Sequence, residues 1–211
     1  MEPQVKKNHY FRKKYDDLKR FISYFYQIEL TTDLDSKKIL EIGKGTGLVS
    51  AYLKELGYQV TTADIAADLQ PDVVADIRQL PFPDNAFDTV TACEVLEHLP
   101  FEDFPKAIAE LRRVSSKYVL ISLPYHSTGF ELVFRFPGVR TLFKRMFIDL
   151  FFRIPLKFGG IKTSGQHYWE IDCCQWSLKK VRSEIKKYFK IRREVRPVLN
   201  YYHRFFILEK Q

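Results

Sequence analysis

The chain has 211 residues, 45% of them hydrophobic and 28% charged, which suits one globular domain and excludes wholesale disorder. The uncharged stretch Tyr118–Phe130 is too short to span a bilayer, and the basic N-terminus lacks the apolar run of a secretory signal. Three cysteines (Cys93, Cys173 and Cys174) show no C-x-x-C spacing, which argues against a disulfide framework or a cysteine-rich zinc site. We therefore expect a cytoplasmic protein and no metal.

The net charge of +8 is unevenly distributed along the chain. Residues 1–124 contain 16 basic and 19 acidic side chains, whereas residues 125–211 contain 18 basic and 7 acidic ones. This asymmetry indicates a nearly neutral first part and a basic second part that faces an anionic partner.

Hydrophobic periodicity predicts alternating helices and strands over most of the chain. A first helix over Phe11–Ile28 places Phe11, Tyr15, Leu18, Ile22 and Phe25 on one apolar face. We expect strands at Lys38–Ile42, Tyr58–Ala63, Val73–Ala75, Phe87–Cys93 and Tyr118–Leu123. Helices are expected from Leu48 to a stop at Gly57, and from Phe104 to Val114.

Beyond an irregular stretch at residues 124–176, Ser177 can cap a helix that turns Leu178, Val181, Ile185 and Tyr188 inward. Ile191–Val198 and Arg204–Glu209 then read as a closing hairpin. Strands that alternate with helices predict a doubly wound α/β fold, with a mostly parallel sheet covered by helices on both faces.

The densest signal is the run from Ile39 to Gly47, in which a short strand leads into three closely spaced glycines before a helix. Such a turn lets a ligand lie against bare backbone, although the same turn also occurs without one. A dinucleotide fingerprint would need a third glycine where this chain has Leu48, and no Gly-Lys-Ser/Thr follows, so a nucleoside-triphosphate loop fails as well.

The spacing Glu41-x-Gly43-x-Gly45-x-Gly47 resembles the first motif of class I S-adenosylmethionine-dependent methyltransferases. The stretch from Leu80 to Val90, followed by Cys93-Glu94-Val95-Leu96-Glu97-His98-Leu99, is similar to the fourth motif of the small-molecule (type 11-like) branch. The resemblance covers residues 38–123 and implies a Rossmann-like seven-stranded sheet and S-adenosylmethionine as the cofactor.

The resemblance also implies which residues hold the cofactor. Asp64, at the end of the second strand, would accept the ribose hydroxyls, and Asp76 with Ile77 would meet the adenine. The cofactor-binding residues expected from the family are Glu41, Gly43, Gly45, Gly47, Asp64, Asp76, Ile77 and Glu94. Lys44 departs from the family pattern and either pairs with the cofactor carboxylate or points to solvent.

The sequence identifies no catalytic residue, because methyl transfer depends mostly on aligning the nucleophile, the methyl carbon and the sulfur. A general base is needed only where the acceptor loses a proton. His98, His126 and His167 are the weak candidates, and for each a hydrogen-bonding or packing role outweighs catalysis.

Between Phe130 and Phe158 the chain places eight of its eighteen phenylalanines among basic residues. Helical spacing of Leu142, Phe143, Met146, Phe147, Leu150, Phe151 and Ile154 predicts a helical lid inserted after the fifth strand. This apolar surface must be covered. It can pack over the cofactor site as a lid, contact a second copy in a homodimer, or contact a lipid surface as a peripheral membrane segment.

The sequence thus predicts a single domain over residues 1–211: an N-terminal helical cover (1–36), a cofactor-binding core (37–123), the inserted lid (124–176) and the closing helix and hairpin (177–211). Its expected function is methyl transfer to a small or amphiphilic acceptor. The alternatives are a non-catalytic binding module that keeps the cofactor fold, for which a membrane surface is one place of action, and a nucleic-acid methyltransferase. The nucleic-acid alternative is less favoured, because the Asp/Asn-Pro-Pro-Tyr/Phe sequence of nitrogen-directed methyltransferases is absent after the fourth strand.

Overall fold

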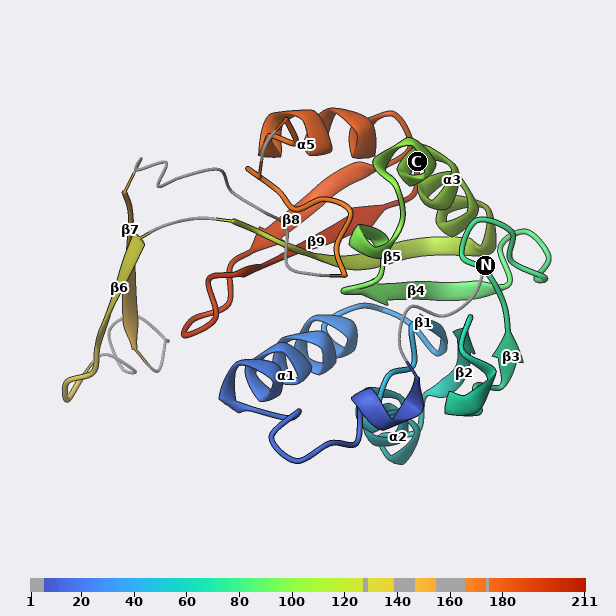
Figure 1. The fold of residues 1–211 in the computed structure, drawn as a ribbon, viewed down its shortest axis with the longest axis horizontal. Helices are drawn as coiled ribbons and strands as arrows, with labels where there is room; N and C mark the ends of the chain where they lie inside the picture. The colour runs from blue at the N-terminus through green and yellow to red at the C-terminus, as the bar shows by residue number, and fades with distance from the viewer. Residues whose placement is uncertain (1–5, 127–128, 139–146, 155–165, 174) are drawn as a thin grey trace.

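The computed structural model describes residues 6–126, 129–138, 147–154, 166–173 and 175–211 and centres on a seven-stranded sheet (Figure 1). The strands are β1 (Lys38–Ile42), β2 (Gln59–Asp64), β3 (Val73–Val74), β4 (Phe87–Cys93), β5 (Ser115–Pro124), β8 (Lys190–Val195) and β9 (His203–Glu209). Their order is β3-β2-β1-β4-β5-β9-β8, in which β9 alone runs antiparallel to both of its neighbours. The expected doubly wound, mostly parallel sheet is confirmed.

Helices cover both faces of this sheet. Figure 1 shows α1 (Leu18–Thr32) and α2 (Leu48–Glu55) on one face, and α3 (Phe104–Val114) and α5 (Leu178–Lys186) on the other. Short 3-10 turns lie at η1 (Lys7–His9), η2 (Ala67–Leu69), η3 (Leu96–His98) and η4 (Phe101–Asp103). No helix in the described residues is long and apolar enough to cross a membrane.

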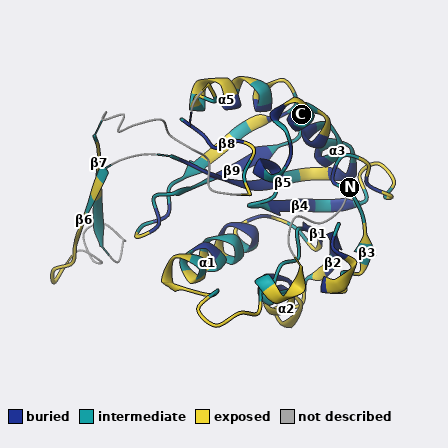
Figure 2. Ribbon diagram, in the orientation of Figure 1, coloured by how far each residue is buried: buried dark blue, intermediate teal, exposed yellow. Residues whose placement is uncertain are grey.

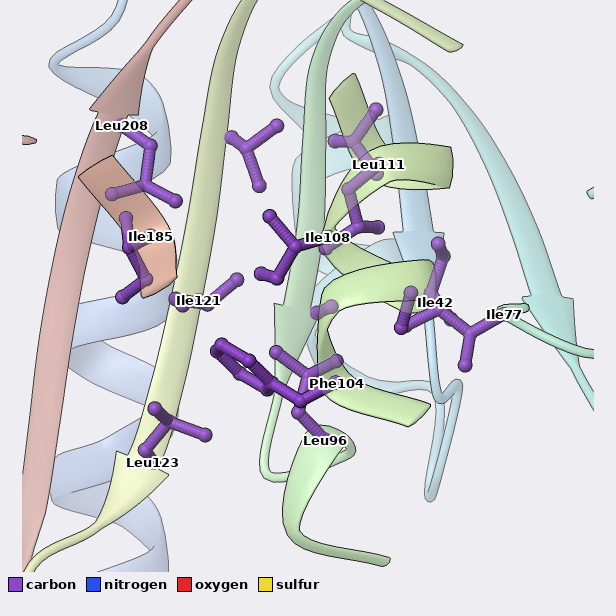
Figure 3. Close-up of a cluster of buried hydrophobic side chains, with 14 of the residues drawn as sticks. Ile42, Ile77, Leu96, Phe104, Ile108, Leu111, Ile121, Leu123, Ile185 and Leu208 are labelled. Carbon is purple, nitrogen blue, oxygen red and sulfur yellow. The ribbon is translucent and has the colours of Figure 1, made fainter. Parts of the chain in front are cut away.

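The larger core lies between the sheet and the pair α3 and α5. Every residue of the predicted α3 face, from Phe104 to Val114, is buried, and Figure 3 shows this face against Ile121 and Leu123 of β5. Ser177 caps α5 as expected, because its hydroxyl accepts a hydrogen bond from the Lys180 amide at 3.2 Å. On the opposite face Leu120 packs against α1.

The first helix differs from its prediction in position and in which face is buried. It begins at Leu18, where the Asp17 carboxylate accepts a hydrogen bond from the Arg20 amide, and not at Phe11. The predicted apolar face is largely exposed: Leu18 is 69% and Phe25 58% accessible. The inward face is mixed: Leu30 packs against the sheet, whereas Ser23 and Gln27 line the pocket described below. Hydrophobic periodicity therefore assigned the wrong side.

The predicted helical lid is wrong over the described part of the insertion. Residues Gly129–Phe134 and Ile148–Arg153 form the antiparallel strands β6 and β7 of a separate two-stranded sheet. Residues 139–146 and 155–165, which carry the rest of the expected helix and most of its basic side chains, lie outside the described residues.

The two faces of this β6–β7 hairpin differ in character. Side chains alternate between the two faces of a strand, so the cross-strand pairs Phe130–Phe152, Leu132–Leu150 and Phe134–Ile148 share one wholly apolar face. All six of these residues except Ile148 are exposed. In Figure 2 the two strands are drawn in the colours of exposed and intermediate residues. The opposite face is mixed, because it carries Val133 and Phe151 beside charged residues. On the opposite face, Arg196 forms ion pairs with both Glu131 and Asp149, which attaches the hairpin to the body of the protein.

Candidate active site

A pocket opens at the carboxyl ends of β1, β2 and β4, where the strand order reverses around β1. In a doubly wound sheet this edge is the usual place for a ligand. Its floor is formed by residues 41–46, 64–66, 75–77 and 93–95, and its far side by His98, Leu99 and His203. The inward face of α1 and the aromatic segment before it form the remaining wall.

The glycine loop between β1 and α2 presents bare backbone to this pocket. Gly43, Gly45 and Gly47 all have left-handed backbone angles, with φ of +81°, +53° and +78°. A side chain at position 43 would place its Cβ 2.4 Å from Val95 Cγ2, whereas a Cβ at 45 would meet only the Tyr10 ring, at 3.8 Å. The approach to Gly45 is therefore open to a ligand, and Gly47 serves as the N-cap of α2.

Lys44 fits neither of its two expected roles. Its ammonium donates hydrogen bonds to the carbonyl oxygens of Leu69 at 3.0 Å and Gln70 at 2.6 Å. These bonds join the glycine loop to the end of η2, where Gln70 has a φ of +52°. The lysine thus fixes the shape of the loop.

Two buried carboxyl groups line the floor of the pocket. Burial raises the pKa of Glu41 to about 7, and its Oε2 accepts no hydrogen bond within the described part of the chain. Asp64 is 8% exposed and accepts a hydrogen bond from the Ala66 amide at 2.8 Å. Burial also raises the pKa of Asp64, although the loop amides of Lys44 and Gly45 oppose this by hydrogen bonding to it. These carboxylates fit a ligand that donates hydroxyl protons.

Asp76 and Ile77 follow β3 and also line the pocket. The Asp76 carboxylate is paired with Arg78, at 2.6 Å between Nη2 and Oδ2, and Arg78 bridges to Asp103 at 2.7 Å. Hydrogen bonding to Arg78 lowers the pKa of Asp76, so this side chain is ionised. The Arg78 amide and Nε donate to Oδ1 at 2.9 and 3.0 Å, and Nε and Nη2 donate to Oδ2 at 3.2 and 2.6 Å. Because a carboxylate has about four lone-pair sites, Arg78 already satisfies most of the acceptor capacity of Asp76.

Glu94, immediately after β4, is held in an uncommon conformation with a φ of +55°. Its Oε1 accepts a hydrogen bond from the Ser122 hydroxyl at 2.7 Å, and its Oε2 lies 3.3 Å from Nε2 of His203. The other ring nitrogen of His203, Nδ1, lies 3.1 Å from the hydroxyl of Ser23 on α1. Carboxylate, imidazole and hydroxyl therefore form a continuous chain that ends on the α1 wall of the pocket.

The imidazole of His203 is suited to accept a proton. Burial lowers its pKa despite the opposing effect of Glu94, so the neutral ring predominates at neutral pH. With the Nε2 proton directed at Glu94, the lone pair lies on Nδ1, beside Ser23.

Comparison with known proteins shows to which family this fold belongs. Residues 40–118 match a family model described as a methyltransferase domain. The chain is 32% identical over 149 residues to a demethylmenaquinone methyltransferase from Thermus thermophilus, a match that spans 58% of this chain and 67% of that protein. The chain belongs to the class I S-adenosylmethionine-dependent methyltransferases.

Other methyltransferases resemble this chain in sequence over about half of its length or in fold over nearly all of it. A ubiquinone biosynthesis O-methyltransferase from Xanthomonas oryzae is 33% identical over 116 residues, 47% of this chain and 48% of that protein, so the chain spans only about half of that relative. Magnesium protoporphyrin IX methyltransferase from Synechocystis, solved with bound SAH, has a TM-score of 0.61 at 17% identity, covering 97% of this chain and 92% of that chain. A SAM-dependent methyltransferase from Aquifex aeolicus has a TM-score of 0.60 at 15% identity, covering 99% and 100%.

The methyltransferase pocket brings together seven of the eight cofactor residues expected from sequence, since all except Gly47 line it. The three candidate histidines separate: His98 lines the pocket, whereas the lining includes neither His126 nor His167. His126 lies 3.8 Å and His167 2.8 Å from the buried carboxylate of Glu170.

Sequence reasoning missed His203 and the pocket wall built from Tyr10, Ser23, Tyr24 and Gln27. Polar residues on the buried side of an otherwise amphipathic helix were the available signal for the α1 part of this wall. No sequence signal pointed to His203, because this residue reaches the pocket only through the antiparallel pairing of β9 with β5, which places it opposite Pro124.

Proposed function

We propose that this methyltransferase transfers a methyl group to a hydroxyl-bearing, amphiphilic small molecule that binds between the glycine loop and α1. One observation carries the proposal: the chain Glu94–His203–Ser23 reaches the same pocket as the glycine loop. The relatives from Thermus and Xanthomonas are named for quinone compounds, which supports an aromatic acceptor that bears hydroxyl groups.

The cofactor fits the residues present. Gly45 leaves the backbone open, the Glu41 carboxyl carries an oxygen without a hydrogen bond in the described residues, and Asp64 offers a buried acceptor. We assign cofactor binding to these residues and to Gly43, Gly47, Asp76, Ile77 and Glu94. S-adenosylmethionine supplies an electrophilic methyl group on a sulfonium centre, which needs no further activation by the protein.

The chain's own residues would then act on the acceptor. The acceptor hydroxyl gives its proton to the Ser23 oxygen as the Ser23 proton passes to Nδ1 of His203, and Glu94 stabilises the resulting imidazolium. The acceptor oxygen is left as an anion. In a phenol or hydroquinone this raises the nucleophilicity of both the oxygen and the ring carbons. One base would therefore serve O-methylation, and also C-methylation, in which the displaced ring proton would leave to solvent water while the imidazolium returns its proton to the acceptor oxygen and the aromatic ring is restored.

The domain organisation follows from this assignment. Residues 37–123 form the cofactor core, residues 6–36 cover it, and residues 177–211 complete the sheet and contribute His203. The cover is held over the site by the amide of Lys7, which donates to Asp68 at 2.8 Å, and by packing among the rings of His9, Tyr10 and Tyr15. We treat these segments as one functional unit.

For the partner surface, we propose that the apolar face of the β6–β7 hairpin contacts a lipid surface that carries the acceptor. Charge supports a lipid surface with anionic headgroups: residues 129–158 contain six basic and two acidic side chains, and both acids, Glu131 and Asp149, are paired with Arg196. A homodimer through the same face is the competing outcome.

The test uses S-adenosylmethionine with a labelled methyl group and two probes, a hydroquinone with a short isoprenoid tail and the same ring without the tail. Label should appear in the tailed probe, and His203→Gln should slow transfer by about 10²–10⁴-fold. Tyr188→Phe, on the far side of the sheet from the pocket, is the control and should retain the rate. Transfer by His203→Gln at the unmutated rate would refute the role of the base, and labelling of neither probe would refute the acceptor class.

A further inference from the structure

Beside the pocket lies a carboxylate that the proposed chemistry does not use. Glu97, within η3, is fully buried, and neither of its oxygens accepts a hydrogen bond in the described part of the chain. Burying an ionised carboxylate without hydrogen bonds is expensive, so a proton or a cation must compensate it.

Two histidines lie next to this carboxylate. Glu97, His98 and His167 each offer one ligand atom, and these three atoms lie within 4.8 Å of one another. The rings of His98 and His167 are perpendicular, with their centroids 5.0 Å apart. We call Glu97, His98 and His167 the three-residue cluster. Two imidazoles and one carboxylate are a common ligand set for first-row transition metals.

The hydrogen bonds of the two histidines orient them for such a role. Nδ1 of His98 lies 3.2 Å from the Gln166 carbonyl oxygen, and Nδ1 of His167 lies 2.8 Å from Oε1 of Glu170. A proton on each Nδ1 satisfies these acceptors and puts the lone pair on Nε2. Histidines that bind metals are usually fixed in this way, through a carbonyl or carboxylate on the other ring nitrogen. The Tyr202 hydroxyl in turn donates to Glu170 at 2.9 Å.

The surroundings favour a positive ion. Two further carboxylates, Glu94 and Glu170, lie near Glu97. Three carboxylates around a small buried volume are stabilised more by a divalent cation than by one proton.

From this geometry we propose that the three-residue cluster binds a divalent transition-metal ion, of which Zn²⁺ and Co²⁺ are representative. Ligand bonds of about 2.0–2.1 Å would draw the three atoms closer together, and a three-ligand site leaves open coordination positions. Because His98 also lines the pocket, the ion would lie at the pocket wall next to the cofactor site.

The experiment titrates the full-length apoprotein, without a histidine tag, with Zn²⁺ by calorimetry and with Co²⁺ by visible absorption. We expect one saturable site for each metal and the absorption bands of low-coordinate Co²⁺. Mg²⁺ should not compete, since it prefers oxygen ligands. Glu97→Gln and His167→Ala should each weaken binding at least tenfold, and Glu170→Gln, which releases His167, by about 10–100-fold.

The matched control is His126→Ala. His126 lies 3.8 Å from the same Glu170 carboxylate but is outside the three-residue cluster, so metal affinity should stay within twofold. Melting temperature and cofactor binding report whether each variant folds. If Glu97→Gln unfolds, the metal affinity of His167→Ala decides the test, because His167 is only partly buried and its removal disturbs the fold less.

Absence of a saturable site, or equal affinity in His167→Ala and the unmutated protein, would overturn the proposal and leave a proton on Glu97. Neither readout involves methyl transfer, so failure here does not bear on the proposed function.

Discussion

The assignment of Asp64 to the cofactor can be tested by removing its carboxylate. Asp64→Ala deletes a buried acceptor at the floor of the pocket. A hydrogen bond to a charged group contributes about 1.5–3 kcal/mol, which corresponds to roughly a ten- to hundredfold loss of affinity. Isothermal titration with S-adenosylhomocysteine at pH 7.5 measures this loss. The affinity of Asp64→Asn should lie between those of the unmutated protein and Asp64→Ala, because the asparagine side-chain oxygen still accepts a hydrogen bond from the Ala66 amide but carries no charge.

The structure provides a matched control in Asp72, which lies just before β3 and is hydrogen-bonded to β2, the strand that ends in Asp64. Asp72 accepts hydrogen bonds from the Thr62 amide at 2.8 Å and the Thr62 hydroxyl at 2.9 Å, and it does not line the pocket. Asp72→Ala should therefore lower the melting temperature and leave cofactor affinity within about twofold. If Asp64→Ala also stays within twofold while folded, the ribose does not bind at Asp64 and the reasoning is refuted.

Three further predictions concern the loop, the floor and the hairpin. Gly45→Arg should abolish binding of S-adenosylhomocysteine by filling the space between the loop and the Tyr10 ring; the left-handed φ of +53° should also lower its melting temperature, so a cooperative thermal transition serves as the check of folding. Binding of this folded variant in calorimetry would contradict the assignment. Because the folded pKa of Glu41 is raised to about 7, this residue should make the apoprotein less stable as pH rises from about 4.5 to 7, on the order of 3 kcal/mol in all. Urea unfolding of Glu41→Gln should lack that part of the pH dependence, and an unchanged profile would contradict the assignment. Phe130→Ser with Phe152→Ser should reduce sedimentation with anionic liposomes at low salt and leave cofactor affinity within twofold, whereas loss of dimerisation would favour the second-copy alternative.

The sequence predicted the parts of the site whose signals are local. The run from Glu41 to Gly47 carries its strand, turn and helix start in adjacent residues, and Asp64 and Asp76 each follow a strand directly. The structure brings them to one pocket because parallel strands end at the same edge of the sheet.

What the sequence could not predict depends on long-range pairing or on competing periodicities. His167 is distant along the chain from Glu97, and only the fold brings their ligand atoms together. In the insertion, alternation at Phe130, Leu132 and Phe134 gave a strand signal, but the spacing from Leu142 to Ile154 also matched a helix. Short apolar runs of this kind fit both periods.

The loop between β8 and β9 touches both the exposed hairpin and the pocket wall. From this loop the Leu199 amide donates to Glu131 of β6 at 2.7 Å, and the Asn200 side chain donates to the Lys19 carbonyl of α1 at 2.9 Å. A displacement of the hairpin against an external surface would thus be transmitted to the helix that carries Ser23. If the hairpin engages a surface as proposed, these two hydrogen bonds would link that contact to the position of the Ser23 hydroxyl.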